Sequence, residues 1–209
     1  MANAWLLRAL IPNKKEPEKS INLLPVFLKH NLIAIGWNEL EDLTGKSADD
    51  IKEAVEGAYG FKSFQLGNAY AVINIFVNKM QIGDLVIVPN GNEIHFARIT
   101  GNYAFNDTVE LSIIPHTRLA EWKGSVLRHD LPDKLRRPLR VLRTAANITK
   151  YYDDFIKIID GSYIDNKTQT IPVEYPLRPE FIVKFSIPKD ITANEANRLS
   201  QYIATLYFD

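Results

Sequence analysis

The stretch 68–103 constrains the fold of this chain more than any other part. Its first half repeats apolar residues every three or four positions, which is typical of the buried face of a helix. Gly83-Asp84 ends this pattern, and two strand-like segments follow, 85–88 and 93–100, with Asn90-Gly91 between them. Asn-Gly between two such segments is the strongest short signal for a β-hairpin. The stretch therefore predicts a helix that packs on an antiparallel sheet.

The remaining elements alternate in a similar way. Short apolar runs predict further strands at 4–10, 32–37, 109–114, 116–122 and 181–187. Helical periodicity and capping residues such as Ser47 and Thr192 predict helices at 47–59, 133–144, 148–159 and 193–206, and Pro138 is expected either to kink or to split the second of these. Helices inserted between short, glycine-punctuated strands favour an α+β fold, with a small curved antiparallel sheet or pseudo-barrel and peripheral helices.

The expected domain organisation is uneven. We expect one domain over residues 1–160 and a connector over 161–179, where glycine, asparagine, threonine and proline occur without periodicity. A C-terminal strand–helix appendage is expected over 180–209. No internal repeat and no low-complexity tract interrupts this organisation.

Composition narrows the possible chemistry. The chain contains no cysteine, which excludes disulfide bonds, thiolate catalysis and cysteine-ligated zinc. It lacks an 18-residue apolar run and an N-terminal secretion signal, so we expect a soluble cytoplasmic protein without a membrane partner. Residues 118–150 hold nine Lys or Arg against three Asp or Glu, although the whole chain is neutral. This basic segment fits a polyanionic partner, or a solvated basic helix.

Catalytic and cofactor motifs are scarce. No two of the four histidines have the spacing of a zinc site, and the chain has no phosphate-binding glycine loop and no nicotinamide fingerprint. We therefore expect no cofactor, no metal and no catalytic activity. One nuclease-like set exists, in which Asp107, Glu121 and Lys123 would bind Mg²⁺ and position a water molecule. A magnesium-dependent nuclease is the alternative function.

The strand expected at 116–122 has an unusual face. The two-residue period of a strand places His116, Arg118 and Trp122 on the same side. Imidazole, guanidinium and indole groups together are untypical of a protein core and suit a ligand-binding surface. The structural alternatives are a hydrogen-bonded histidine and a surface pair in which Arg118 stacks on Trp122.

Five sequence pieces, taken in order, resemble one family. They are Trp5-x-x-Arg8-Ala9; residues 33–37 with Asp42-Leu43; Phe76 leading into Gly83-Asp84-Leu85-Val86; residues 97–103; and His116-Thr117-Arg118 with Trp122. The set resembles the N-terminal region of predicted restriction endonucleases of the Mrr-cat type, over about residues 4–145. That region is similar to the EVE, YTH and PUA-like group of small barrels, so the resemblance implies a PUA-like or EVE-like fold.

The resemblance also implies a reader of modified nucleic acid. In the EVE and YTH relatives a base is flipped out and held in an aromatic pocket, where stacking repays the cost of flipping. Trp37 matches the tryptophan that forms a cage wall in YTH-type readers. The full set of candidates for the base pocket is Trp37, Trp122, Tyr103, Arg8, His116 and Arg118. The candidates for phosphate contacts are Arg128, Arg136, Arg137, Arg140 and Arg143.

These expectations combine into one predicted function. The chain would be a non-catalytic recognition module that binds DNA with a modified base, methylation being the favoured modification. It would serve as the specificity domain of a restriction or phage-defence system, and a nuclease or motor would come from a partner or another domain. An RNA-binding PUA-like module is a further alternative, because stacking and phosphate contacts look alike for both polymers.

Overall fold

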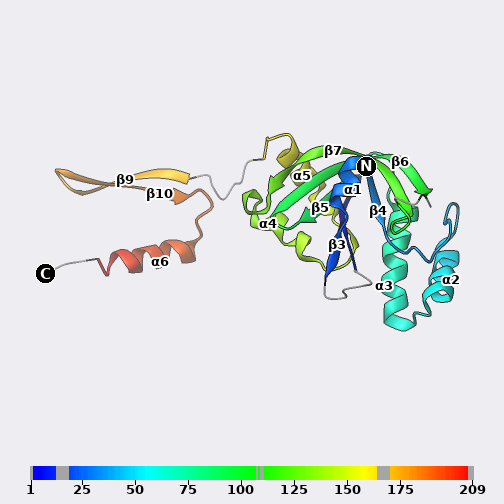
Figure 1. The fold of residues 1–209 in the computed structure, drawn as a ribbon. Coiled ribbons are helices and arrows are strands. Elements are labelled where there is room, and N and C mark those ends of the chain that lie inside the picture. Colours follow the sequence, from blue (N-terminus) through cyan, green and yellow to red (C-terminus); the bar gives the residue numbers. More distant parts are fainter. Residues whose placement is uncertain (1, 13–18, 107, 109–110, 164–169, 207–209) are drawn as a thin grey trace. The chain divides into compact units, whose positions relative to one another are not determined.

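The computed structural model describes residues 2–12, 19–106, 108, 111–163 and 170–206, which divide into two compact units, 1–162 and 163–209. The larger unit is built on a curled, half-barrel sheet of six strands in the order β4-β7-β6-β5-β1-β8 (Figure 1). All neighbouring strands are antiparallel except β1 and β5. The strands are β1 (Ala4–Leu7), β4 (Leu32–Ile35), β5 (Leu85–Asn90), β6 (Glu93–Phe105), β7 (His116–Leu127) and β8 (Ala145–Asn147). The expected mixture of helices with a small curved sheet is confirmed.

The central stretch folds as its pattern predicts. Helix α3 (Ser63–Asn74) continues into a π-helix, η1 (Ile75–Lys79), and β5 and β6 form the hairpin that follows. Gly91 lies at the hairpin turn with φ of 57°, a conformation that glycine adopts at little cost. The helix begins at Ser63, earlier than the apolar repeat indicates.

The hydrogen bonds that Asp84 accepts explain why an acidic residue follows the helix. Its carboxylate is 2% exposed and accepts a hydrogen bond from Trp5 Nε1 at 2.7 Å. The same carboxylate accepts the backbone N–H of Asn3 at 2.7 Å and that of Gln81 at 3.0 Å. One buried side chain therefore joins the segment before β1, β1 itself and the turn before β5.

Both faces of the sheet are covered. Val86 and Val88 belong to the main hydrophobic cluster, together with residues from α2 (Ala48–Tyr59) and α3. Ile87 alternates to the opposite face, where its cross-strand partner Phe96 contacts the ring of Phe155 in α5 (Tyr152–Ile159) at 6.2 Å. Burial on both faces accounts for the continuous apolar run in β5.

The remaining short elements connect the sheet. They are β2 (Leu10–Pro12), β3 (Ser20–Asn22), α1 (Leu24–His30), η2 (Arg128–Asp130), α4 (Asp133–Arg136), η3 (Pro138–Arg140) and η4 (Thr149–Tyr151). The capping residue expected for α2 is confirmed, because the side chain of Ser47 accepts the backbone N–H of Asp50.

One expectation within the larger unit is wrong, and one open alternative is decided. The strand expected at 109–114 is absent from its described part, since residues 111–113 form a turn; residues 109 and 110 lie outside the described residues. Pro138 splits the helix expected at 133–144 into α4 and η3, which is one of the two outcomes expected for this proline, because it has no backbone N–H to donate.

The smaller unit contains a hairpin of β9 (Thr170–Arg178) and β10 (Phe181–Pro188), followed by α6 (Ala193–Ile203). The strand β9 lies in the segment 161–179, where a connector without regular structure is expected. Ile171, Val173 and Tyr175 do alternate with polar or proline residues, but the prolines obscure this two-residue period. Helix α6 begins with the expected capping box of Thr192 and Glu195.

Gly101 provides a test of packing in the larger unit. It lies at the bulge where β6 passes β7, and a Cβ atom at this position would lie 2.9 Å from Leu119 Cβ. We expect Gly101→Ala to lower the free energy of unfolding by about 1–3 kcal/mol, measured by chemical denaturation. Gly57→Ala is the matched control: position 57 lies inside α2 with open space around it, so a gain of about 0.5–1 kcal/mol is expected. A loss of the same size in both variants would contradict the packing explanation.

Candidate functional site

An open cleft lies between α3 and the segment after η3, and we call it the aromatic cleft. Its volume is about 620 Å³, within the range of small-ligand sites. Three aromatic rings face it, and polar groups complete its rim. The lining residues are Trp37, Phe61, Phe64, Gln65, Asn68, Ala69, Val72, Leu142, Arg143 and Thr144. Phe64 is 78% exposed and Leu142 is 91% exposed, so two large apolar side chains at this cleft remain in contact with water.

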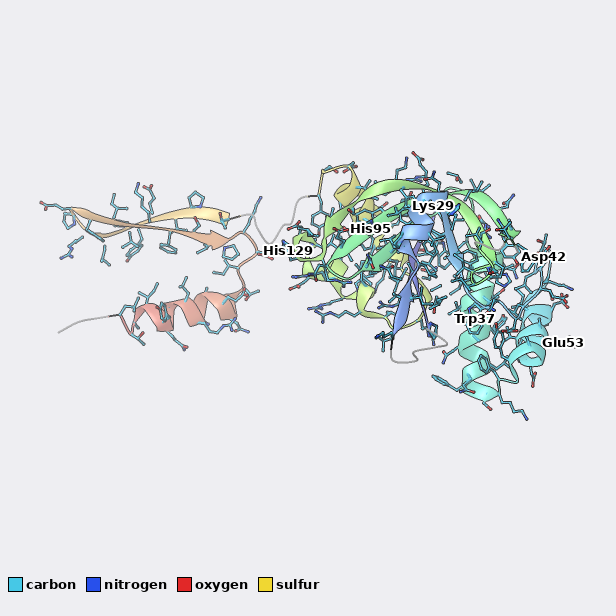
Figure 2. The ribbon with its side chains drawn as sticks, viewed as in Figure 1. Lys29, Trp37, Asp42, Glu53, His95 and His129 are labelled. Carbon is cyan, nitrogen blue, oxygen red and sulfur yellow. The ribbon has the colours of Figure 1, made fainter. Side chains whose placement is uncertain are left out.

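Trp37 is held in position by other rings and by its backbone. Its ring lies edge-on to Tyr59 at 5.4 Å and to Phe61 at 6.3 Å, while Tyr59 and Phe61 stack on each other. The backbone of Trp37 has φ of 73°, in the left-handed region that residues other than glycine rarely adopt. Such conformations are uncommon and cluster at functional sites. Figure 2 shows Trp37 beside α3.

A buried hydrogen-bonded chain supports the Trp37 backbone. His116 is fully buried, and its Nε2 lies 3.2 Å from the carbonyl oxygen of Trp37. Because that oxygen only accepts, Nε2 must carry the proton. His116 Nδ1 then accepts the hydroxyl of Tyr103 at 2.8 Å, and the Tyr103 oxygen accepts the backbone N–H of Leu43 at 3.1 Å. His116 and Tyr103, which are expected in the base pocket, therefore support the backbone of Trp37 through this chain of hydrogen bonds.

This chain predicts a pH dependence of stability. Burial lowers the pKa of His116 below its ordinary value of 6.5, while the Trp37 carbonyl and Asp42 act more weakly in the opposite direction. The folded protein keeps the imidazole neutral where the unfolded chain binds a proton. Stability is therefore complete above pH 6.5 and is lost as the pH falls below it, at up to about 1.4 kcal/mol per pH unit.

Chemical denaturation between pH 7.5 and 5 would measure this loss. His116→Gln lacks the titrating imidazole, so the free energy of unfolding of this variant should fall less steeply over the same pH range. Parallel pH profiles for the two proteins would contradict the assignment of the loss to His116.

A second recess lies at the tip of the β5–β6 hairpin, and we call it the arginine hollow. Its volume is about 270 Å³, and Asn92, Arg128, His129, Arg136 and Arg140 line it. Three residues expected to contact phosphates therefore meet here from η2, α4 and η3. Carboxylates accompany only part of this charge: His129 pairs with Asp130 at 3.2 Å and Arg136 pairs with Asp133. His129 marks this region in Figure 2.

Arg8 holds the segment that follows η3 in place through hydrogen bonds to its backbone. Its Nε and Nη2 donate to the carbonyl oxygen of Val141 at 2.9 and 2.6 Å, and Nη2 also reaches that of Leu139 at 3.2 Å. The backbone N–H of Arg8 donates to Thr144 at 2.8 Å. Burial and the nearby charge of Arg128 lower the pKa of Arg8. Arg8 is expected from the sequence to line the base pocket, but its guanidinium is occupied by these carbonyl groups.

The segment 140–144 joins the two recesses. Arg140 lines the arginine hollow, and Arg143, only three residues later, lines the aromatic cleft. Arg137 is exposed and lines neither recess. The five arginines expected to contact phosphates therefore lie in three places. Three line the arginine hollow, Arg143 lines the aromatic cleft, and Arg137 lines neither.

A family model described as a domain of unknown function (DUF8426) matches residues 17–135, more than half of the chain. The chain belongs to the DUF8426 family. No curated protein and no solved structure matches it. The DUF8426 region supplies Trp37, Phe61 and Phe64 to the aromatic cleft, while Leu142 and Arg143 follow the matched region.

Trp122 lies outside the aromatic cleft that this DUF8426 protein forms. In the pairing of β4 with β7, Ile35 is opposite His116 and Leu32 is opposite Leu119, so Trp37 and Trp122 lie beyond opposite ends of this pairing. Six residues separate positions 116 and 122, which corresponds to about 20 Å along a strand. The Trp122 ring lies 6.4 Å from that of His95, and Figure 2 shows His95 well away from Trp37. The two tryptophans do not form walls of one pocket.

Arg118 also faces the interior of the DUF8426 region. It is 4% exposed, and its Nε and Nη2 donate to the carbonyl oxygens of Phe76 and Val77, each at 2.8 Å. Its guanidinium lies 5.9 Å from the centre of the Phe76 ring. Burial lowers its pKa to about 10, so the group stays charged at neutral pH. Arg118 therefore satisfies the carbonyl groups at the end of η1, and it stacks on Phe76 instead of Trp122.

The nuclease-like set of the DUF8426 protein is only partly described. Glu121 and Lys123 form an ion pair on the exposed side of β7, and Asp107 lies outside the described residues. Within the described chain, no group of three or more histidine, aspartate or glutamate side chains could hold a metal ion. No helix in the same residues has the length and apolar character needed to cross a membrane.

Sequence reasoning missed several residues of the aromatic cleft. Phe61 lies in the connection between α2 and α3, and Phe64, Gln65 and Asn68 lie on α3. The available signal is Phe61 and Phe64 in the connection after Gly60 and at the start of α3, since large exposed apolar residues need a partner. Leu142 gives no comparable signal, because it directly follows the apolar Val141.

Proposed function

We propose that this chain is a non-catalytic module that binds nucleic acid and holds one base in the aromatic cleft, with modified DNA as its preferred ligand. The observation that carries the proposal is the composition of the cleft: three aromatic rings, two amides and one guanidinium around about 620 Å³ of open space. A nucleobase offers flat faces for stacking and polar edges for hydrogen bonds, so it suits all three kinds of group.

The expected stacking energy is comparable with the cost of extracting a base from a duplex. Extracting a base from a duplex costs a few kcal/mol, whereas stacking on aromatic side chains contributes about 1–3 kcal/mol per base. Arg143 at the rim and the group of Arg128, Arg136 and Arg140 can add phosphate contacts, which fix orientation without reading sequence. These contacts also predict that affinity falls as salt increases.

The resemblance noted in the sequence supports the same ligand. A curled sheet with Trp37 at a cleft is compatible with the PUA-like group, in which an aromatic pocket receives a flipped base. By this resemblance the chain acts as a specificity module of a restriction or phage-defence system. Cleavage of DNA would then require a nuclease on another domain or partner.

Fluorescence anisotropy with matched oligonucleotides tests the proposal. The duplexes should be identical except for one base that is unmodified, 5-methylated cytosine or N6-methylated adenine, with an RNA of the same sequence as competitor. We expect one modification to bind at least about fourfold more tightly, because each buried methyl group contributes about 0.8 kcal/mol. Equal affinity for every base would contradict modified-base reading, and preference for the RNA would favour the RNA-binding alternative.

Incubation of the same duplexes with Mg²⁺ or Mn²⁺ separates the module from the alternative nuclease. A non-catalytic reader leaves all of them intact. Cleavage that Glu121→Gln abolishes would instead support the nuclease.

A further inference from the structure

The arginine hollow is a recess and not a stripe along the surface. Its lining comes from four places in the chain: the hairpin turn, η2, α4 and η3. A surface that follows a polymer backbone spaces its cations along a line, because each phosphodiester has a single charge. Convergence of cations on about 270 Å³ instead suits one compact anion.

The charge at this recess is only half balanced. Four guanidinium groups lie at or beside it, since Arg8 is close enough to Arg128 for the two charges to repel. Asp130 and Asp133 are the carboxylates paired with its lining residues. Among the residues that the structure describes, these four positive and two negative charges leave two positive charges. A terminal phosphate has a charge of about −1.5 to −2 at pH 7, and a phosphodiester has only −1.

Donors on two of the lining arginines also lack partners. The Nε of Arg136 is buried and has no hydrogen-bond partner among the described residues. The side chain of Arg140 makes no hydrogen bond or ion pair within the part of the chain that the structure describes. The exposed guanidinium of Arg140 is therefore available to phosphate oxygens, which guanidinium groups bind with two parallel hydrogen bonds.

We propose that the arginine hollow binds a terminal phosphate of a nucleic-acid strand, a few nucleotides from the base in the aromatic cleft. This inference rests on the proposed function, because it takes the ligand to be a nucleic-acid strand. The segment 140–144 lines both recesses, so one strand can occupy them together. The module would then select strand ends, as produced by cleavage, over continuous duplex.

Fluorescence anisotropy of the whole chain tests this with single-stranded DNA of one sequence. The oligonucleotide is prepared with a 5′-phosphate, with a 3′-phosphate, and with hydroxyl groups at both ends. One of the phosphorylated forms should bind at least about tenfold more tightly than the hydroxyl form, since each new charge-assisted contact is strong. Inorganic phosphate and adenosine monophosphate serve as competitors that lack the strand.

Two substitutions in the hollow should remove this preference. In Arg140→Gln and in Arg128→Gln, the affinities for the phosphorylated and hydroxyl forms should differ by no more than about twofold. Arg137→Gln is the matched control, because Arg137 is exposed between α4 and η3 but does not line the hollow, and this variant should keep the full preference. Thermal unfolding of each variant checks that the fold is retained.

The outcomes separate this inference from the proposed function. Equal affinity for phosphorylated and hydroxyl ends overturns the terminal-phosphate site, while binding that depends on Phe64 would still support the base cleft. Adenosine monophosphate alone binding as tightly as the phosphorylated strand overturns the strand as ligand. Failure of every oligonucleotide to bind overturns the proposed function, and this inference with it.

Discussion

Arg118→Met is expected to lower the free energy of unfolding by about 3–5 kcal/mol, one of the largest stability losses available in this chain. The carbonyl groups of Phe76 and Val77 lie near the end of the π-helix η1, where no later backbone N–H is available to them. The guanidinium of Arg118 is their donor, and methionine would fill the space without donating. Two buried acceptors would then be left unsatisfied. Urea unfolding followed by tryptophan fluorescence measures the loss.

Two further variants make this expectation specific. Arg118→Lys keeps the charge but presents one ammonium group instead of a planar fork, so it should recover only part of the stability. Arg137→Met removes an exposed arginine and should change the free energy of unfolding by less than about 0.5 kcal/mol. If Arg118→Met instead left stability unchanged and abolished nucleic-acid binding, Arg118 would be a ligand-contacting residue, as its sequence pattern suggests.

The helix–hairpin unit could be predicted because its signals are local. The three- and four-residue apolar repeat, the Gly83-Asp84 stop and the Asn90-Gly91 turn each act within a few positions along the chain. Ser47 and Thr192 were identifiable as helix caps for the same reason, since a capping side chain bonds a backbone group three residues away. Tertiary context did not override any of these preferences.

The face formed by His116, Arg118 and Trp122 shows the limit of such reasoning. A two-residue period determines which side chains share a face, but it does not determine which face is buried. The structure turns this face inward, because His116 supports the Trp37 carbonyl and Arg118 satisfies carbonyl groups of η1. Those acceptors lie 79 and 42 residues away in sequence, so no local pattern could reveal them.

The aromatic cleft is hidden from the sequence for a related reason. Its walls come from the end of β4, the connection after α2, helix α3 and the segment after η3. Each part contributes one to five residues that are ordinary in their local sequence. The resemblance to known readers singled out Trp37, whereas Phe61, Phe64 and Leu142 become neighbours only through the packing of α3 beside the sheet.

Phe64→Ala and Trp37→Ala should have the largest effects on ligand binding. Loss of one stacking ring costs about 1–3 kcal/mol, so each variant should bind the preferred oligonucleotide about 5- to 150-fold more weakly. Phe64 is the cleaner test because it is 78% exposed and little packing is lost with it. Trp37 is only half-buried, but its ring also packs on Tyr59 and Phe61, so some stability is lost as well.

Conservative and distant substitutions complete this test. Trp37→Phe keeps an aromatic face and the same left-handed backbone, so it should retain much of the affinity. Trp122→Phe alters a tryptophan near the opposite end of the β4–β7 pairing and should leave affinity unchanged. Anisotropy titrations at one fixed salt concentration compare all four variants. If Phe64→Ala binds like the unaltered chain while Trp122→Phe loses affinity, the base lies beside β7 and His95, and the aromatic cleft is not its site.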